Sequence, residues 1–245
     1  MNKVSPALDE QISQYWATYL GCTPRDLNGE QTLVVQPAAC TGLVAVCKGN
    51  GWVVGVPTTW GQAIGDALSP YFASQQLPNL NRVRHVLAAC GAPDLYGPAR
   101  IFLQPTPPPL GNLSMLLRPL QVADLPLLDS FATEMGELVW SFGQGEGWLG
   151  AWVAFVDQRL VSVCAVRVWG ELLAEIYIDT LPAYRHRGYG KAVTTAAVQW
   201  VLANTPYVVE SVVELVNESS LALMASLHFK AYGYLLVSEA PTKAL

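Results

Sequence analysis

Short apolar runs separated by turn-forming residues cover most of this chain, and none approaches the length of a membrane span. Runs rich in Val, Leu and Ile between Gly, Pro or Asp residues predict strands, and runs behind a capping residue predict helices. In the second half of the chain we predict helices that begin at Asp124 and Ala192, and strands at 115–119, 152–156, 160–169, 172–178, 207–216 and 232–237. From 115 to 216 the predicted order is strand, helix, three strands, helix and strand, and the strand at 232–237 follows.

The first hundred residues carry a separate set of predicted elements. We predict helices at 9–20, 60–74 and 81–90, and strands at 32–36, 42–47, 52–56 and 99–103. Four prolines then lie between Gln104 and Asn112, and proline disfavours both helix and sheet interiors. The sequence therefore predicts an N-terminal α+β lobe at 1–104, a proline-rich linker at 105–112 and a second domain at 113–245.

A basic loop joins the predicted strand at 172–178 to the helix that follows it. Three of the eight Lys and Arg residues in 111–245 lie in this loop, although the same part of the chain holds thirteen Asp and Glu residues. A glycine-containing loop between a strand and a helix presents backbone N–H groups and the positive helix end to an anion. We therefore predict a phosphate site at Arg185, His186, Arg187, Gly188, Tyr189, Gly190 and Lys191.

The spacing of the glycines excludes two common phosphate motifs. A P-loop requires Ser or Thr after its Gly-Lys pair, where this chain has Ala192. The dinucleotide fingerprint requires a third glycine, where this chain has Val193. The remaining pattern is Arg-x-x-Gly-x-Gly, which resembles the coenzyme A pyrophosphate loop of the GNAT (GCN5-related) acyltransferase superfamily.

A second segment, 217–229, is also similar to this superfamily. Asn217, Ser220, Leu223 and Phe229 have the spacing of its later motif, and the predicted order of elements is the superfamily's order. The resemblance implies an α+β (mixed α/β) protein, with the GNAT acyltransferase fold at 113–245 and a smaller α+β lobe before it. Two-lobe members with a degenerate N-terminal half exist, so a degenerate copy of the fold at 1–104 is left open.

The resemblance implies acetyl-CoA as the acyl donor and a contact for each part of it. The loop from Arg185 to Lys191 would hold the pyrophosphate. Asn217 would bind the pantetheine arm, with a plain helix N-cap as the alternative, and Ser220 would cap the next helix or touch the coenzyme. Backbone groups at the end of the strand would bind the pantetheine amides: Ile178, Asp179 and Thr180.

Glu175 is the candidate general base. Its triplet, Ala-Glu-Ile at 174–176, is similar to the one at this point of the strand in histone-type members of the superfamily. Apolar neighbours would partly desolvate the carboxylate, which favours the protonated form and makes it a better base. The alternatives are a solvated surface carboxylate and an ion pair with Arg167 on the neighbouring strand.

The general acid departs from the superfamily pattern. Met224 stands where members often carry Tyr, and a thioether cannot donate a proton. Tyr232, a short distance downstream, is therefore our candidate catalytic proton donor. His228 stands where the motif has Gly, and we expect a left-handed turn there because His is enriched among non-glycine residues with positive φ.

Composition narrows the remaining classes of function. A net charge of −5 and a pI of about 5.2 argue against nucleic acid as a partner. The five cysteines contain no C-x-x-C pair, so we expect reduced thiols and no metal site. Because no apolar signal region follows Met1, we expect a cytoplasmic location and no membrane partner.

The resemblance thus implies an acyl-CoA-dependent N-acyltransferase whose partners are acetyl-CoA and a primary amine, and it leaves a homodimer open. The acidic balance mildly suits a cationic acceptor. We expect the acceptor side at 137–150, a segment rich in Gly and Trp. The alternative is a non-catalytic acyl-CoA-binding or partner-binding module of the same fold, because Met224 replaces the usual Tyr.

Overall fold

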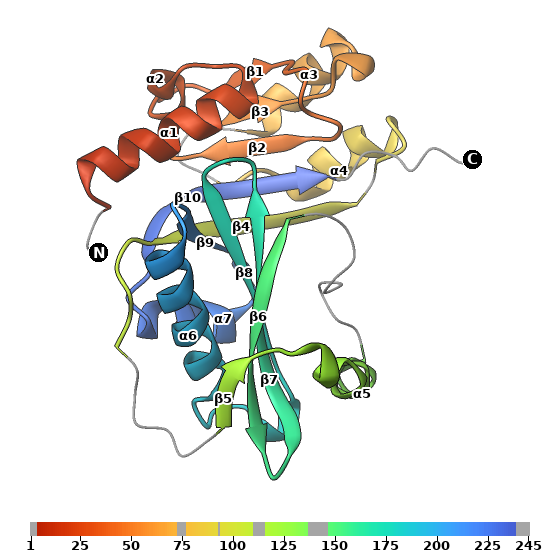
Figure 1. Ribbon diagram of the computed structural model, residues 1–245. Coiled ribbons are helices and arrows are strands. Elements are labelled where there is room, and N and C mark those ends of the chain that lie inside the picture. Colours follow the sequence, from red (N-terminus) through yellow and green to blue (C-terminus); the bar gives the residue numbers. More distant parts are fainter. Residues whose placement is uncertain (1–3, 73–76, 93, 110–115, 137–146, 239–245) are drawn as a thin grey trace. The chain divides into compact units, whose positions relative to one another are not determined.

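The computed structural model describes residues 4–72, 77–92, 94–109, 116–136 and 147–238 (Figure 1). The contacts among its residues divide the chain into two compact units. The first unit contains Met1–Phe102, Val212–Glu218 and Lys230–Leu245, and the second contains Leu103–Ser211 and Ser219–Phe229. The first unit therefore combines the N-terminal lobe with two later segments. The domain boundaries at 104 and 113 stay a prediction.

In the first unit the strands are ordered β1-β3-β2-β10-β4. β1 and β3 are parallel, and β2 is antiparallel to both β3 and β10. The strands of this unit are β1 (Leu33–Val35), β2 (Val44–Cys47), β3 (Val53–Gly55), β10 (Lys230–Ser238) and β4 (Leu95–Gln104), whose last two residues belong to the second unit. The helices are α1 (Pro6–Leu20), α2 (Pro24–Leu27), α3 (Gln62–Leu68) and α4 (Leu80–Ala88), with 3-10 turns at Thr58–Trp60 and Ser69–Tyr71.

The first helix, α1, begins at Pro6, three residues before the predicted range of 9–20, and ends at Leu20 as predicted. Ser5 precedes it in an extended conformation and its hydroxyl accepts a hydrogen bond from the N–H of Leu8, while Pro6 occupies the first turn. Gly21 ends the helix with a φ of 65°, a left-handed conformation that suits glycine. The core of the unit lies between the sheet and α3 and α4, and it includes Leu43, Ala45, Trp52, Val54, Leu68, Phe72, Val83, Leu87 and Leu236.

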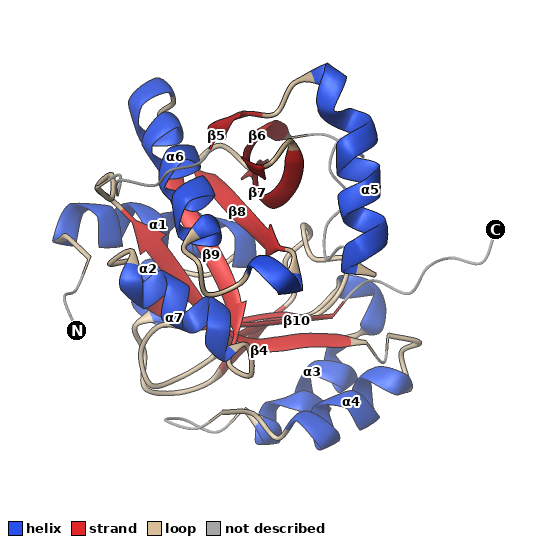
Figure 2. Ribbon diagram, turned by 90° about the horizontal axis from the view of Figure 1, so that it is seen from below, coloured by secondary structure: helices blue, strands red, loops and turns tan. Residues whose placement is uncertain are grey.

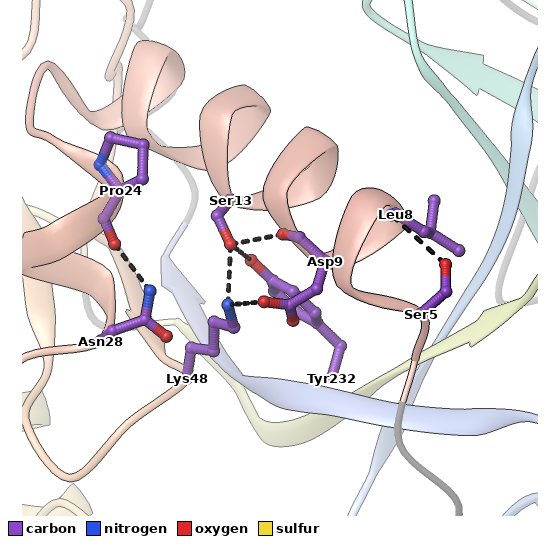
Figure 3. A network of polar contacts seen from close by, with 8 residues as sticks. All are labelled: Ser5, Leu8, Asp9, Ser13, Pro24, Asn28, Lys48 and Tyr232. Atoms are coloured by element: carbon purple, nitrogen blue, oxygen red, sulfur yellow. Dashed lines mark hydrogen bonds and ion pairs between the residues drawn. The ribbon is translucent and has the colours of Figure 1, made fainter.

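A buried polar network joins α1 to β10 and to the end of β2 (Figure 3). The Lys48 ammonium lies 2.6 Å from Oδ2 of Asp9 and 2.8 Å from Oγ of Ser13. Oγ of Ser13 lies 3.1 Å from the Tyr232 hydroxyl and also donates to the carbonyl of Asp9. Because Ser13 is only 1% exposed, water cannot replace these partners.

In the second unit the strands are ordered β9-β8-β7-β6-β5. β5, β6, β7 and β8 are antiparallel neighbours, and β8 and β9 are parallel. The strands are β5 (Leu116–Pro119), β6 (Trp148–Val156), β7 (Arg159–Trp169), β8 (Leu173–Thr180) and β9 (Val208–Glu214), whose first four residues belong to this unit. The helices are α5 (Leu125–Met135), α6 (Tyr189–Asn204) and α7 (Glu218–Ser226), with 3-10 turns at Val122–Asp124 and Pro182–Tyr184.

Helices α5 and α6 cover opposite faces of this sheet (Figure 2). Leu128 and Phe131 of α5 pack on alternate residues of β6 and β7, among them Val153, Val163 and Ala165. α6 packs against β6, β7 and β8. Because side chains alternate along a strand, each face receives every second residue. Trp148 and Tyr177 project from the face toward α5, where they are partly buried and pack against this core.

The predicted order of elements in the second half of the chain is confirmed, from β5 through α5, β6, β7, β8 and α6 to β9. His228 has a φ of 61°, as its replacement of the usual glycine predicts. Asp124 precedes α5 but does not cap it. Its carboxylate accepts two hydrogen bonds from Arg118 and one from the Gln121 amide, which lower the pKa of Asp124 to about 2.

Among the described residues, no helix combines the length and apolar character needed to cross a membrane.

We expect Ser13→Ala to lower the free energy of unfolding by about 1–3 kcal/mol, because the Lys48 ammonium and the Tyr232 hydroxyl each lose a buried partner. Ser130→Ala is the matched control. Its hydroxyl also donates to a carbonyl four residues earlier in a helix, at 3.0 Å, but it is exposed. Urea unfolding of both variants measures the difference, and equal losses would contradict a stabilising role for the network.

Candidate functional site

The predicted anion loop is exposed and leads directly into α6. After β8 and the 3-10 turn at Pro182–Tyr184, residues 185–188 are exposed and α6 begins at Tyr189. His186 has a φ of 60° and Gly188 a φ of 86°. These two left-handed residues turn the backbone so that the helix begins immediately after the loop, and glycine adopts this conformation without a steric penalty.

The first turn of α6 offers hydrogen-bond donors to an anion. The first N–H with an acceptor near the start of the helix is that of Ala192, which donates to the carbonyl of Gly188 at 3.0 Å. For the N–H groups of Tyr189, Gly190 and Lys191 the described part of the chain supplies no acceptor. α6 has sixteen residues, so its dipole adds positive potential at the same place.

Three basic side chains of the loop are held in place by other contacts. Nε of Arg185 donates to the carbonyl of Thr180 at 3.1 Å, and the Lys191 ammonium donates to the carbonyl of Ser226 at 3.1 Å. The guanidinium of Arg187 lies 5.6 Å from the ring centroid of Tyr184. Each cation keeps further N–H groups that these contacts do not use. The loop therefore presents positive charge that is already oriented.

Gly190 allows the first turn of α6 to approach the end of β8. A Cβ atom at this position would lie 3.2 Å from Oγ1 of Thr180, closer than ordinary van der Waals contact. The same Cβ would lie 3.9 Å from the side chain of Leu223 in α7. The motif's second glycine thus brings the helix N-terminus against the strand end.

At the strand end, Ile178–Thr180, the register of β8 continues with β7 but not with β9. β7 pairs with β8 as far as Thr180, whereas the register with β9 stops at Glu175. Oγ of Ser162 donates to the carbonyl of Asp179 at 2.9 Å and lies 2.8 Å from Oγ1 of Thr180. These bonds fix the strand end from the β7 side.

Glu175 lies on the α5 face of the sheet within a small hydrogen-bonded group. Its Oε2 accepts one bond from Nε1 of Trp169 and one from the Tyr177 hydroxyl, both at 2.6 Å. Burial raises the pKa of Glu175 above its ordinary value, while these two donors and the charge of Arg167 lower it by a smaller amount. The structure contains no ion pair between Glu175 and Arg167, both of which it describes.

A second carboxyl group, which we did not predict from the sequence, lies opposite Glu175. Glu210 on β9 is the register partner of Glu175, it is 3% exposed, and its Oε1 has no hydrogen-bond partner. Burial raises the pKa of Glu210 well above its ordinary value, and the neighbouring charge of Glu175 raises it further. A signal was present in the sequence, since Glu210 interrupts a Val-rich strand, but a single charge gives no register.

Four strands contribute to one row across this face. Trp148 on β6 is opposite Arg167 on β7, which is opposite Glu175 on β8, which is opposite Glu210 on β9. Register partners in neighbouring strands project from the same face of a sheet. The row therefore places an aromatic ring, a cation and two carboxyl groups side by side.

The remaining predicted residues are divided between the units. Ser220 belongs to the second unit, with the loop and Glu175, whereas Asn217 and Tyr232 belong to the first. The roles of Asn217 and Tyr232 therefore rest on the sequence resemblance and stay predictions. Met224 is 0% exposed and packs in the interior, so it presents no group to a substrate. Residues 137–146, where we predict most of the acceptor side, lie outside the described residues.

All five cysteines are free thiols, and burial raises the pKa of Cys40 and Cys47 to about 11. Within the described ranges, His, Cys, Asp and Glu side chains form no group of three that could hold a metal ion.

Comparison with known proteins finds one family model that matches part of the chain. Residues 118–229 match the family model described as the acetyltransferase (GNAT) family. No curated protein matches the chain.

Solved structures with a similar fold include a GNAT-family acetyltransferase from Novosphingobium aromaticivorans, which is 22% identical with a TM-score of 0.51. That match covers 60% of this chain and 65% of the other. A GCN5-related N-acetyltransferase from Kribbella flavida is 12% identical with a TM-score of 0.48, over 65% of this chain and 64% of the other. This chain thus spans slightly less than two thirds of the length of these two proteins. The first match confirms the predicted mixed α/β fold.

We expect Glu210→Gln to flatten the pH dependence of stability. Because the pKa of Glu210 is raised, the native protein keeps a proton that the unfolded chain releases near pH 4.3. The free energy of unfolding therefore falls as the pH rises from that value toward the native pKa. Gln carries no such proton, so the fall should be smaller by up to about 1.4 kcal/mol per pH unit.

Chemical denaturation between pH 5 and pH 8 measures this slope for wild type, Glu210→Gln and the exposed control Glu171→Gln. If Glu210→Gln and wild type lose stability equally over this range, Glu210 does not hold a proton in the folded protein.

Proposed function

We propose that this protein is an acyl-CoA-dependent N-acyltransferase that transfers an acetyl group from acetyl-CoA to a primary amine. The match of residues 118–229 to the acetyltransferase (GNAT) family model supports the proposal. The observation that carries the proposal is the arrangement along β8. Glu175 lies within this strand, and the anion loop follows its end at Thr180. At about 3.3 Å per residue, Glu175 and the strand end at Thr180 are separated by about 17 Å. An extended coenzyme arm along the strand connects a phosphate site to a reaction site.

The coenzyme is held by the residues that the loop and the strand end present. The pyrophosphate lies against the N–H groups of the first turn of α6 and the cations of Arg185, Arg187 and Lys191. His186, Gly188, Tyr189 and Gly190 shape this backbone. The pantetheine arm runs along Ile178, Asp179 and Thr180, where β9 no longer pairs with β8. Asn217 and Ser220 complete the predicted set of coenzyme contacts.

Glu175 acts as the general base in this proposal. Its carboxylate removes a proton from the acceptor ammonium, and the free amine attacks the thioester carbonyl carbon. The new C–N bond forms as the C–S bond breaks, the nitrogen loses a second proton, and the thiolate gains one. Desolvation raises the pKa of Glu175, which makes its carboxylate a stronger base than an exposed one. Tyr232 remains the predicted donor of the proton to the thiolate.

The alternative function is a coenzyme-binding module without turnover. It is favoured by one observation, the buried Met224 in the position where the superfamily often has Tyr. A thiolate is only weakly basic, with a pKa near 8.5, so the absence of this Tyr does not by itself prevent acyl transfer. Binding and turnover are therefore tested separately.

We expect acetyl-CoA to raise the melting temperature of wild type and to raise that of Gly188→Trp much less, because the indole fills the space in front of the first turn of α6. Gly136→Trp is the matched control, since Gly136 also has a positive φ, 84°, and its Cβ would meet no atom of the described residues within 4 Å. Differential scanning fluorimetry measures both shifts. The absence of a shift in wild type with any acyl-CoA would exclude both candidate functions.

We expect Glu175→Gln to reduce turnover roughly 100-fold or more while it leaves the acetyl-CoA melting shift unchanged, because only the base is removed. Wild-type activity should rise with pH through a pKa above the ordinary glutamate value, since the carboxylate is the active form. Thiol release from acetyl-CoA with a panel of primary amines measures this, with the exposed Glu171→Gln as control. Full activity of Glu175→Gln would show that Glu175 is not the base.

A further inference from the structure

Arg167 occupies an unusual position beside the proposed base. It is the register partner of Glu175 on one side and of Trp148 on the other. Its guanidinium lies 4.5 Å from the ring centroid of Trp169 and 5.8 Å from that of Trp148. Arginine stacks on aromatic faces in this way, and two rings restrict the orientation of the guanidinium plane.

The hydrogen-bonding capacity of this guanidinium is unused. Its Nε is buried without a partner, and in the described part of the chain Arg167 forms neither a hydrogen bond nor an ion pair. A buried N–H group without an acceptor costs stability, and such groups are rare in native proteins. Stacking holds the cation in place but satisfies none of its five donors.

Glu175 is not the counterion that this arginine lacks. Oε2 of Glu175 accepts hydrogen bonds from Trp169 and Tyr177, and no atom of its carboxylate is within 4.0 Å of the Arg167 guanidinium. The two charged groups instead project side by side from neighbouring strands, about 5 Å apart. One molecule with a cationic end and an anionic end, a few bonds apart, can contact both.

We propose that Arg167 binds a carboxylate of the acceptor, and that the acceptor is a small amino acid whose amine lies at Glu175. This inference rests on the proposed N-acyltransferase function and adds the class of its acceptor. A carboxylate accepts two parallel N–H···O bonds from a guanidinium, and the stacked geometry provides the planar fork for such a pair.

The local charges here oppose the net charge of the protein. A net charge of −5 would favour a cationic acceptor, but Arg167 places a positive charge next to the position of the acceptor amine. An acceptor with a second cation would meet this charge at close range, whereas an amino acid neutralises it. At contact distance in a partly desolvated site, the neighbouring charge outweighs distant ones that water and salt screen.

The test compares acceptors that differ only in the anionic group. We would measure kcat/KM for glycine and glycinamide, with 6-aminohexanoate as an acceptor whose carboxylate is too far from its amine. The ratio of glycine to glycinamide on one enzyme cancels changes in the strength of the base, because both acceptors use the same Glu175. Variants are Arg167→Met, Arg167→Lys and, as matched control on the same strand, Arg159→Met, whose arginine is exposed and far from Glu175 along β7.

We expect Arg167→Met to lower the glycine-to-glycinamide ratio roughly 10- to 100-fold, mainly through the KM for glycine, because a charge-assisted bidentate contact is lost. The ratio for Arg167→Lys should lie between those of wild type and Arg167→Met, since lysine keeps the charge but lacks the two parallel N–H donors. Arg159→Met should keep the wild-type ratio. If Arg167→Met does not fold, Arg167→Lys and the wild-type preference for glycine over 6-aminohexanoate carry the test.

The outcomes separate this inference from the proposed function. Acetylation of glycinamide with an unchanged ratio in the Arg167 variants would overturn the carboxylate site and leave the acyltransferase intact. Acetylation of other amines but of no amino acid would also overturn the carboxylate site and leave the acyltransferase function intact. A melting shift with acetyl-CoA and no acetylation of any amine would overturn both and favour the non-catalytic module.

Discussion

The register of four strands in the second unit is the constraint on which its chemistry depends. Backbone pairing between β6, β7, β8 and β9 places Trp148, Arg167, Glu175 and Glu210 in one row on one face. If any of these strands shifted its register by one residue, the side chain that it contributes to the row would project from the opposite face, which α6 covers. The packing of α5 on the same face opposes such a slip, because Leu128 and the alternate apolar residues of β6 and β7 would lose their contacts.

The two carboxyl groups of this row, Glu175 and Glu210, show that hydrogen bonds determine how far burial raises the pKa of a carboxyl group. Both are removed from water, and burial raises both pKa values. Glu175 has two donors at 2.6 Å, from Trp169 and Tyr177, which favour its ionised form, whereas Oε1 of Glu210 has none. The same sheet therefore holds a carboxyl group that ionises more readily, Glu175, next to one that retains its proton to higher pH, Glu210. The charge of Glu175 also raises the pKa of Glu210.

The anion loop depends on a different kind of feature, the backbone. Its conformation needs a left-handed residue at Gly188, and the close approach of α6 to β8 needs the missing side chain of Gly190. The cations at Arg185 and Lys191 are oriented by carbonyl groups of Thr180 and Ser226. Because a loop of this kind is defined by local spacing, seven consecutive residues are sufficient to predict it.

The sequence alone determined the order of the strands and helices, the anion loop and the candidate base. These are local properties: apolar periodicity marks β7 and α6, glycine spacing marks the loop, and an apolar flank marks Glu175. Only the tertiary structure decided which side chains meet. Glu210 lies 35 positions after Glu175, Trp169 and Trp148 enclose Arg167 from two strands, and β10 with Tyr232 joins the N-terminal lobe. Strand pairing depends on contacts between distant residues, and no spacing in a single chain specifies its register.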